Sequence, residues 1–142
     1  MWNIKRFEEL SLGELTEIFL LRQEVFILEQ ESLFEDIDGE DGEAIHIFYQ
    51  EDDMVKSYCR ITKSDKIVIG RVLVNPDYRG EGRGKELFDY ALEHVKQEYP
   101  STPVANTAMC YLEDFYETFG FRRISERYDI AGDQHVNMAL EQ

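Results

Sequence analysis

The sequence predicts a mixed α/β fold in which helices pack against one central sheet. Three observations lead to this class. Some segments carry apolar residues at helical spacing and others carry short apolar runs, in the order β-α-β-β-β-α-β-α-β-β. Hydrophobic residues make up 43% of the chain and aromatic residues 13%, as in globular proteins. The 142 residues are the length of one domain, so we predict a single domain over residues 1–142.

The N-terminal part predicts a short strand, Trp2–Phe7, followed by a long helix. Ser11 is placed to cap this helix, because Glu14 stands three residues later in the capping-box position. Its apolar residues form a wide face: Leu12, Leu15, Ile18, Phe19, Leu21, Val25, Phe26 and Leu28. Arg22 and Glu29 fall on the same face, so we expect them to point toward the protein.

An acidic loop, Gln30–Gly42, separates this helix from three predicted strands. The strands are Ala44–Gln50, Met54–Lys63 and Lys66–Val74. The last of them is almost continuously apolar, as expected for a central strand that is covered on both faces.

The C-terminal half predicts two helices and three more strands. In chain order they are a helix from Gly82 to Glu98 that ends before Pro100, a strand Val104–Ala108, a helix Leu112–Phe119 ended by Gly120, and a closing hairpin of Phe121–Tyr128 and Val136–Leu140 around Ala131-Gly132-Asp133.

The charge of the chain restricts its partners. Lys and Arg number 15 against 30 Asp and Glu, which gives a net charge of −15. This excess excludes nucleic acid and anionic membranes as partners and favours a cationic one. Cys59 and Cys110 lie far apart without metal-ligand spacing, and no segment is as apolar as a signal peptide or a membrane span. We therefore expect a reduced, cytoplasmic protein; a homodimer stays open.

The most informative segment is the glycine-dense turn after the apolar third strand of the central group, Val72-Leu73-Val74-Asn75-Pro76-Asp77-Tyr78-Arg79-Gly80-Glu81-Gly82-Arg83-Gly84-Lys85. Three glycines let successive backbone N–H groups face one point, and a helix N-terminus adds positive potential there. The segment predicts a cradle for a pyrophosphate. It fits neither a Walker A loop nor Gly-x-Gly-x-x-Gly. The alternative is a glycine-rich turn with solvated basic residues.

The stretch Arg79-Gly80-Glu81-Gly82-Arg83-Gly84 matches the Arg/Gln-x-x-Gly-x-Gly/Ala signature of the GCN5-related N-acetyltransferases (GNAT), and the element order is similar to that family's over nearly the whole chain. Further stretches resemble its ElaA-type branch or its last helix: Leu21-Arg22-Gln23-Glu24-Val25-Phe26-Ile27-Leu28-Glu29-Gln30, Asp36-Ile37-Asp38-Gly39, Ile69-Gly70-Arg71-Val72 and Phe115-Tyr116-Glu117-Thr118-Phe119-Gly120-Phe121. The resemblance implies a mixed, mostly antiparallel, twisted sheet whose strands splay at the cofactor site.

The resemblance also implies acetyl-CoA as cosubstrate and no metal. Backbone N–H groups from Gly80 to Lys85 would bind the pyrophosphate, and the main chain of Leu73 and Val74 would pair with the pantetheine arm as an added strand. An N–H near Val74 would stabilise the oxyanion. The implied cofactor-binding residues are Leu73, Val74, Arg79, Gly80, Gly82, Arg83, Gly84 and Lys85. We expect binding to be insensitive to the side chain at position 81 and sensitive to substitution of Gly82 or Gly84.

Acetyl transfer from a thioester to an amine also needs a base and an acid. By the resemblance, Tyr116 would protonate the leaving thiolate; the alternative is a core tyrosine packed beside Phe115 and Phe119. The strand Ile67–Val74 carries no carboxylate, so the base stays open. Its candidates are Glu29, Asp36, Asp38, His46 and a water chain.

The carboxylate and the histidine candidates for the base could instead have structural roles. Burial would raise the pKa of Glu29 into a useful range, unless Glu29 pairs with Arg22 or Arg71. His46 and His135 lie among strand hydrophobes, which is typical of core histidines with satisfied nitrogens.

Arginines 22, 60 and 71 stand in apolar segments and need acidic partners, which the acidic loop offers in Glu35, Asp36, Asp38 and Asp41. The same loop lacks the glycine position and the final Glu of an EF-hand, so calcium is excluded.

These observations together predict an acetyl-CoA-dependent N-acetyltransferase. We expect the acceptor to be a primary amine of a cationic small molecule or peptide. It would be acetylated by direct attack in a ternary complex. Glu29, Asp36, Asp38 and His46 are the expected acceptor-binding residues. A non-catalytic acyl-CoA-binding or sensor module of the same fold is the alternative.

Overall fold

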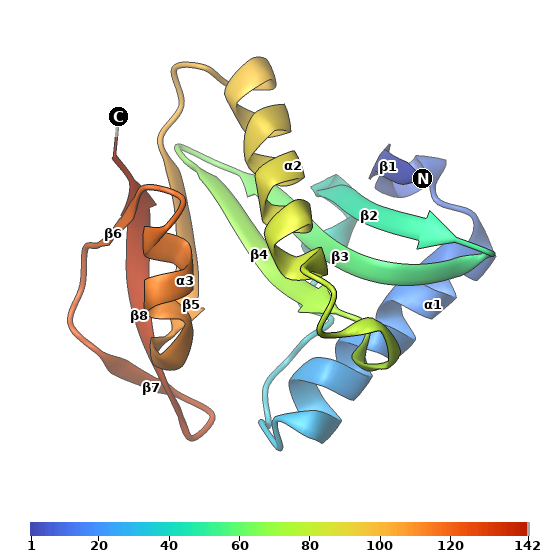
Figure 1. The fold of residues 1–142 in the computed structure, drawn as a ribbon, viewed down its shortest axis with the longest axis horizontal. Coiled ribbons are helices and arrows are strands. Elements are labelled where there is room, and N and C mark those ends of the chain that lie inside the picture. Colours follow the sequence, from blue (N-terminus) through green and yellow to red (C-terminus); the bar gives the residue numbers. More distant parts are fainter. Residues whose placement is uncertain (142) are drawn as a thin grey trace.

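Eight strands form one mixed sheet in the order β1-β2-β3-β4-β5-β8-β6, with β7 paired to β8 (Figure 1). The computed structural model describes residues 1–141. The strands are β1 (Trp2–Arg6), β2 (Ile45–Glu51), β3 (Met54–Lys63), β4 (Ile67–Val74), β5 (Val104–Met109), β6 (Phe121–Arg123), β7 (Tyr128–Ile130) and β8 (Asp133–Leu140). All pairings are antiparallel except that of β4 with β5, so the predicted mixed, mostly antiparallel sheet is confirmed.

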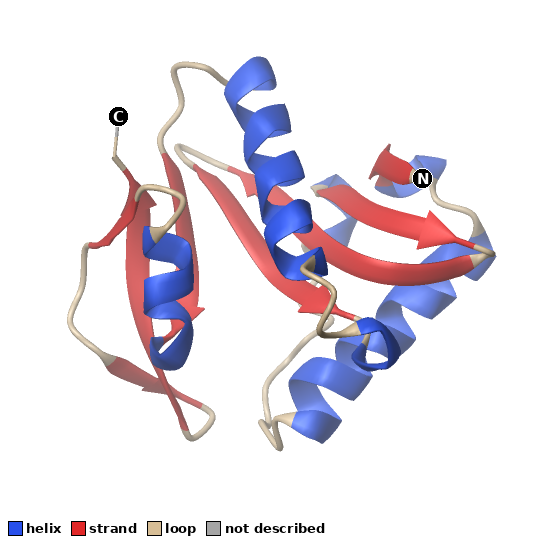
Figure 2. Ribbon diagram, in the orientation of Figure 1, coloured by secondary structure: helices blue, strands red, loops and turns tan. Residues whose placement is uncertain are grey.

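Helices cover both faces of the sheet (Figure 2). Helix α1 (Leu12–Arg22) packs on one face, where Ile18 and Leu21 join a cluster with Phe48 of β2. Helices α2 (Arg83–Glu98) and α3 (Glu113–Glu117) pack on the other face, in a larger core that contains Ile47. Ile47 and Phe48 are neighbours on β2, so their side chains point to opposite faces. Within residues 1–141 no helix has the length and apolarity needed to cross a membrane.

Helix α1 begins as predicted and continues differently. The N–H of Glu14 donates to Ser11 Oγ at 3.0 Å, and the N–H of Ser11 donates to Glu14 Oε1 at 2.9 Å, which confirms the capping box. After Arg22 the chain widens into π-helical turns over Gln23–Glu29. Wider turns change the angular spacing of side chains. The predicted single apolar face is wrong at both ends: Leu28, within the π-helical turns, is 62% exposed, and Leu12, the first residue of α1, is 84% exposed.

The C-terminal strands differ from the predicted hairpin. The expected strand Phe121–Tyr128 is two short pieces, β6 and β7, which pair with different parts of β8. The tight turn between β7 and β8 has Ala131 at φ 51° and Gly132 at φ 93°. Two successive positive φ values suit the twist of a two-residue hairpin, so β8 starts at Asp133, three residues earlier than predicted.

Strands β4 and β5 are paired only at one end. Ile67 lies opposite Val104 and Val68 opposite Ala105, and no further pair between the two strands is formed within the described chain. Beyond this point the strands diverge, as Figure 1 shows. The β5-side edge of β4 from Ile69 to Val74 therefore leaves its backbone groups free of a neighbouring strand.

Candidate functional site

Two cavities occupy the gap between the diverging strands. The first, the glycine cavity, has a volume of about 650 Å³ and is lined by the turn Arg79–Lys85, by β4 and by α3. The second, the hairpin cavity, has a volume of about 450 Å³ and extends to the acidic loop and the β7–β8 hairpin. The two cavities share four lining residues: Gln30, Val72, Leu112 and Tyr116. Ligands entering from the two sides would therefore meet beside Tyr116.

The main chain of the glycine turn presents backbone amides to the glycine cavity. Gly80 and Gly82 have φ values of 86° and 75°, which L side chains rarely adopt. Gly82 is the N-cap of α2, and no side chain among residues 1–141 caps it. The first N–H groups of this helix of 16 residues are thus available to a ligand at its positive end.

The basic side chains of this turn already have partners. Arg79 binds Glu29 through two bonds of 2.6 and 2.7 Å, and Lys85 binds Asp89 at 3.0 Å. Arg83 lies over the ring of Tyr49, 5.5 Å from its centroid. Among the described residues, the groups of this turn without a hydrogen-bond partner are therefore the first backbone amides of α2 and Arg83 Nε.

Strand β4 is irregular where the cavities meet. Gly70 lies opposite Arg60 and Leu73 opposite Tyr58, so β4 holds one residue more than β3 in this interval. The extra residue is accommodated by Arg71 at φ 51°, a strained value for a side chain of this size. The bulge lies beside Val72, which lines both cavities.

Tyr116 is 5% exposed and lies on α3 between the two cavities. Its ring packs edge-on against Phe88 and Phe115 at centroid distances of 5.0 and 5.2 Å. Burial raises the pKa of the Tyr116 phenol above its ordinary value, so the hydroxyl keeps its proton at neutral pH. The core packing proposed as the alternative role is present, and it holds the hydroxyl-bearing ring at the junction of the cavities.

The prediction that burial raises the pKa of Glu29 is wrong. Its side chain is 41% exposed, and the hydrogen bonds from Arg79 hold the pKa of Glu29 below its ordinary value. The predicted partners Arg22 and Arg71 are also wrong, because the π-helical turns direct Glu29 toward the glycine turn instead. A carboxylate with a lowered pKa that holds a guanidinium at two oxygens is a poor proton acceptor at neutral pH.

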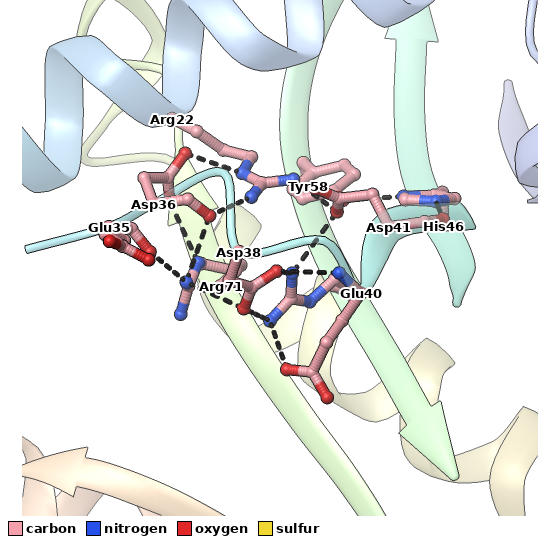
Figure 3. A network of polar contacts seen from close by, with 10 residues as sticks. Arg22, Glu35, Asp36, Asp38, Glu40, Asp41, His46, Tyr58 and Arg71 are labelled. Carbon is pink, nitrogen blue, oxygen red and sulfur yellow. Dashed lines mark hydrogen bonds and ion pairs between the residues drawn. The ribbon is translucent and has the colours of Figure 1, made fainter. Parts of the chain in front are cut away.

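Beneath the hairpin cavity, three arginines and three aspartates form a closed network (Figure 3). Arg22 is fully buried and bonds Asp36 at 3.0 Å and Asp41 at 2.7 Å. The pKa of Asp38 would rise by burial, but hydrogen bonds from Arg60 and the nearby charge of Arg71 hold it well below its usual range. The predicted pairing of the three arginines with the acidic loop is confirmed, and every charge in the network has a partner.

Asp36, Asp38 and His46 are not among the described residues that line either cavity, and their contact with an acceptor stays a prediction. The aspartates point to the arginines. His46 is fully buried, with Nδ1 2.7 Å from the hydroxyl of Tyr58 and Nε2 3.0 Å from the carbonyl oxygen of Asp41. Burial lowers the pKa of His46, so the ring is a neutral core histidine, as the sequence pattern indicated.

Residues 11–142 match the sequence model of the acetyltransferase (GNAT) domain. The chain belongs to the GNAT family. Protein ElaA of Escherichia coli is 38% identical to it over 146 residues, which cover 99% of this chain and 95% of ElaA. The crystal structure of that ElaA matches with a TM-score of 0.93 over 99% of both chains. An acyl-CoA N-acyltransferase from Pseudomonas aeruginosa matches with a TM-score of 0.94 at 29% identity over 99% of both chains. The resemblance to the ElaA-type branch is thus confirmed.

GNAT membership and fold support acyl-CoA-dependent acyl transfer, and the glycine cavity fits such a ligand. It combines uncapped helix amides, glycines at positive φ and a free strand edge, which suit a pyrophosphate followed by an amide-bearing arm. Among residues 1–141 no three His, Cys, Asp or Glu side chains are placed to share a metal ion. Cys59 and Cys110 are both free thiols.

The sequence did not indicate that residues of the β7–β8 hairpin line this GNAT site. Asp133 and His135 line the hairpin cavity, and the hydroxyl of Ser32 donates to the carboxylate of Asp133 across 101 positions of the chain. No local pattern marks such a contact, because it depends on how β8 is placed beside the acidic loop. For His135, the only signal was a histidine at a strand position.

Proposed function

We propose that this protein transfers the acetyl group of acetyl-CoA to a primary amine by direct attack in a ternary complex. The observation that carries the proposal is the free edge of β4, which runs into the glycine turn between two cavities that share Tyr116. A ligand held at the turn and along the edge would present its thioester beside this phenol. The acceptor would approach from the hairpin cavity.

Each part of the chain has a role in this proposal. Backbone amides from Gly80 to Lys85 bind the pyrophosphate, and the main chain of Leu73 and Val74 pairs with the pantetheine arm. The thioester supplies an activated acyl group. A main-chain N–H of β4 near Val74 stabilises negative charge on its carbonyl oxygen. Tyr116 gives its proton to the departing thiolate.

The acceptor is proposed to be cationic. The chain carries a net charge of −15, and Glu40 and Asp133 line the hairpin cavity. Arg60 and Arg71 line it too, but the aspartates of the network neutralise them. We expect kcat/KM at low salt to be higher for a cationic amine than for a neutral amine of the same size. Equal values would remove this part of the proposal.

Tyr116→Phe separates an enzyme from the alternative, a sensor that binds acyl-CoA without turnover. In an enzyme the variant lowers thiol release by a factor of about 10²–10⁴, the usual contribution of an acid or base, and keeps its affinity for CoA in calorimetry. Tyr90→Phe is the matched control, because Tyr90 stacks on Trp2 at 4.3 Å, away from the residues that line either cavity. If the two variants release thiol at the same rate, Tyr116 is not the acid.

A further inference from the structure

The groups considered as bases are all engaged elsewhere. Glu29 is held by Arg79, and Asp36 and Asp38 are held by the buried arginines. Both nitrogens of His46 have partners. The proposed reaction still needs a group that removes a proton from the amine, because an alkylamine is protonated at neutral pH and an ammonium has no lone pair for attack.

Among residues 1–141, one histidine lines the hairpin cavity and has a nitrogen without a hydrogen-bond partner. Nδ1 of His135 lies 2.8 Å from the carbonyl oxygen of Asp133. A carbonyl oxygen only accepts hydrogen bonds, so Nδ1 carries the proton and the lone pair of the neutral ring is on Nε2. This differs from His46, in which the carbonyl of Asp41 is bonded to Nε2 and the hydroxyl of Tyr58 to Nδ1.

The sheet register places His135 near the reacting position. From the last pair of the two diverging strands, Val68 and Ala105, equal steps along both strands reach Val72 and Met109. Met109 is paired with His135 across β5 and β8. His135 therefore stands at about the height of the β4 bulge, across the gap from Val72, and it lines the same cavity as Tyr116.

The orientation of the ring follows from strand alternation. Val136, the next residue on β8, belongs to the core formed with α2 and α3. His135 consequently points to the opposite face, from which the acceptor is proposed to enter. The bond between Ser32 and the carboxylate of Asp133 joins this end of β8 to the chain after Glu29 and fixes its position.

We propose that Nε2 of His135 is the base that deprotonates the acceptor amine; this inference rests on the proposed acetyl transfer. The ammonium gives one proton to Nε2, which passes it to solvent. The nitrogen then forms a bond to the thioester carbon, and the carbon–sulfur bond breaks as the thiolate takes the proton of Tyr116. The second proton leaving the nitrogen restores the phenol. The products are the amide, CoA with its thiol and one released proton.

Several ionisable groups surround this ring. The ring of Tyr128 on β7 has its centroid 6.4 Å away, and Asp133 lies two residues before His135 on β8. The cavity is also lined by Glu40, Arg60, Arg71 and Tyr116. A pH profile of the wild-type protein alone would report all of these groups together, so the test compares variants.

The first measurement uses His135→Gln and the matched control His94→Gln, which makes the same change on α2 away from the residues that line either cavity. Acceptors are butylamine, which is protonated at neutral pH, and butyric hydrazide, which is not. We expect kcat for butylamine to fall by a factor of about 10²–10⁴ in His135→Gln, with a much smaller fall for the hydrazide and unchanged CoA affinity.

An equal loss with both acceptors, or a loss no larger than that of His94→Gln, would overturn the base while leaving the acetyl transfer in place. Wild-type protein that binds CoA and acetylates neither acceptor would overturn the transfer and the base together.

The second measurement does not depend on turnover. Nitrogen-15 chemical shifts of the His135 ring in the free protein distinguish the two neutral forms. A proton on Nδ1 supports the proposal. A neutral ring with its proton on Nε2 would overturn it whatever the rate measurements show, because Nε2 then has no lone pair to offer.

Discussion

The glycine turn lines the glycine cavity, and the arginine network lies beneath the adjoining hairpin cavity. The polar groups of the two regions are paired in opposite ways. In the network, Arg22, Arg60 and Arg71 meet three aspartates, and charge is balanced inside the protein. In the turn, Arg79 pairs with Glu29 and Lys85 pairs with Asp89, while no side chain of the described residues caps the first amides of α2. The comparison shows two arrangements: ion pairs that balance charge beside the hairpin cavity, and helix amides without side-chain partners that are available to a ligand.

The largest effect is expected from breaking the network at Arg22. Arg22→Met leaves Asp36 and Asp41 buried without their main partner, which costs about 3–5 kcal/mol of unfolding free energy. Chemical denaturation measures this, with Arg6→Met as control, since the Arg6 side chain is 64% exposed and solvent screens its ion pairs. Similar losses in both variants would show that the network does not depend on its buried arginine.

The second prediction uses the pH dependence of stability to test whether His46 is a buried, neutral ring. Burial lowers the pKa of His46, so below about pH 6.5 the unfolded chain takes up a proton that the folded chain does not. The contribution of His46 to the free energy of unfolding is fully present above this pH. It falls as pH decreases, with a slope of up to about 1.4 kcal/mol per pH unit. His46→Asn should flatten the slope between pH 6.5 and 5, and His94→Gln should keep it. A slope unchanged in His46→Asn would contradict the buried neutral ring.

The third prediction breaks the turn. Gly82→Ala places a side chain at φ 75°, so the backbone shifts and its amides no longer converge. The dissociation constant for CoA should rise about tenfold, which corresponds to about 1.4 kcal/mol. Glu81→Ala is the control and should change it little. Gly84 is not strained, and an added Cβ would lie 3.6 Å from Val74 Cγ2. Weaker CoA binding by Gly84→Ala without loss of stability would therefore report close approach of the ligand.

The smallest effect sharpens the role of Glu29. Its bond to Arg79 competes with any anion at the turn, so Glu29→Gln should tighten CoA binding by about two- to fivefold at low salt, as expected for an exposed ion pair of up to about 1 kcal/mol. Glu93→Gln on α2 removes the same charge away from the cavities. An equal gain in both variants would point to the overall charge of the protein and not to this pair.

The sequence was sufficient for features that depend on neighbours along the chain. The capping box at Ser11, the order of strands and helices as far as α3 and the glycine turn before α2 follow from spacing and backbone conformation, and each is present. The need of Arg22 for acidic partners also follows from its apolar surroundings, because a buried charge must be paired.

Tertiary structure alone decided which ionisable groups face the cleft. The π-helical turns after Arg22 moved Glu29 from the expected interior to Arg79, and the placement of β8 made His135 a cavity residue while His46 became a core residue. Both histidines occupy similar strand positions in the sequence. Their difference comes from which strands diverge and which loop crosses them, and such contacts join residues that are far apart in the chain.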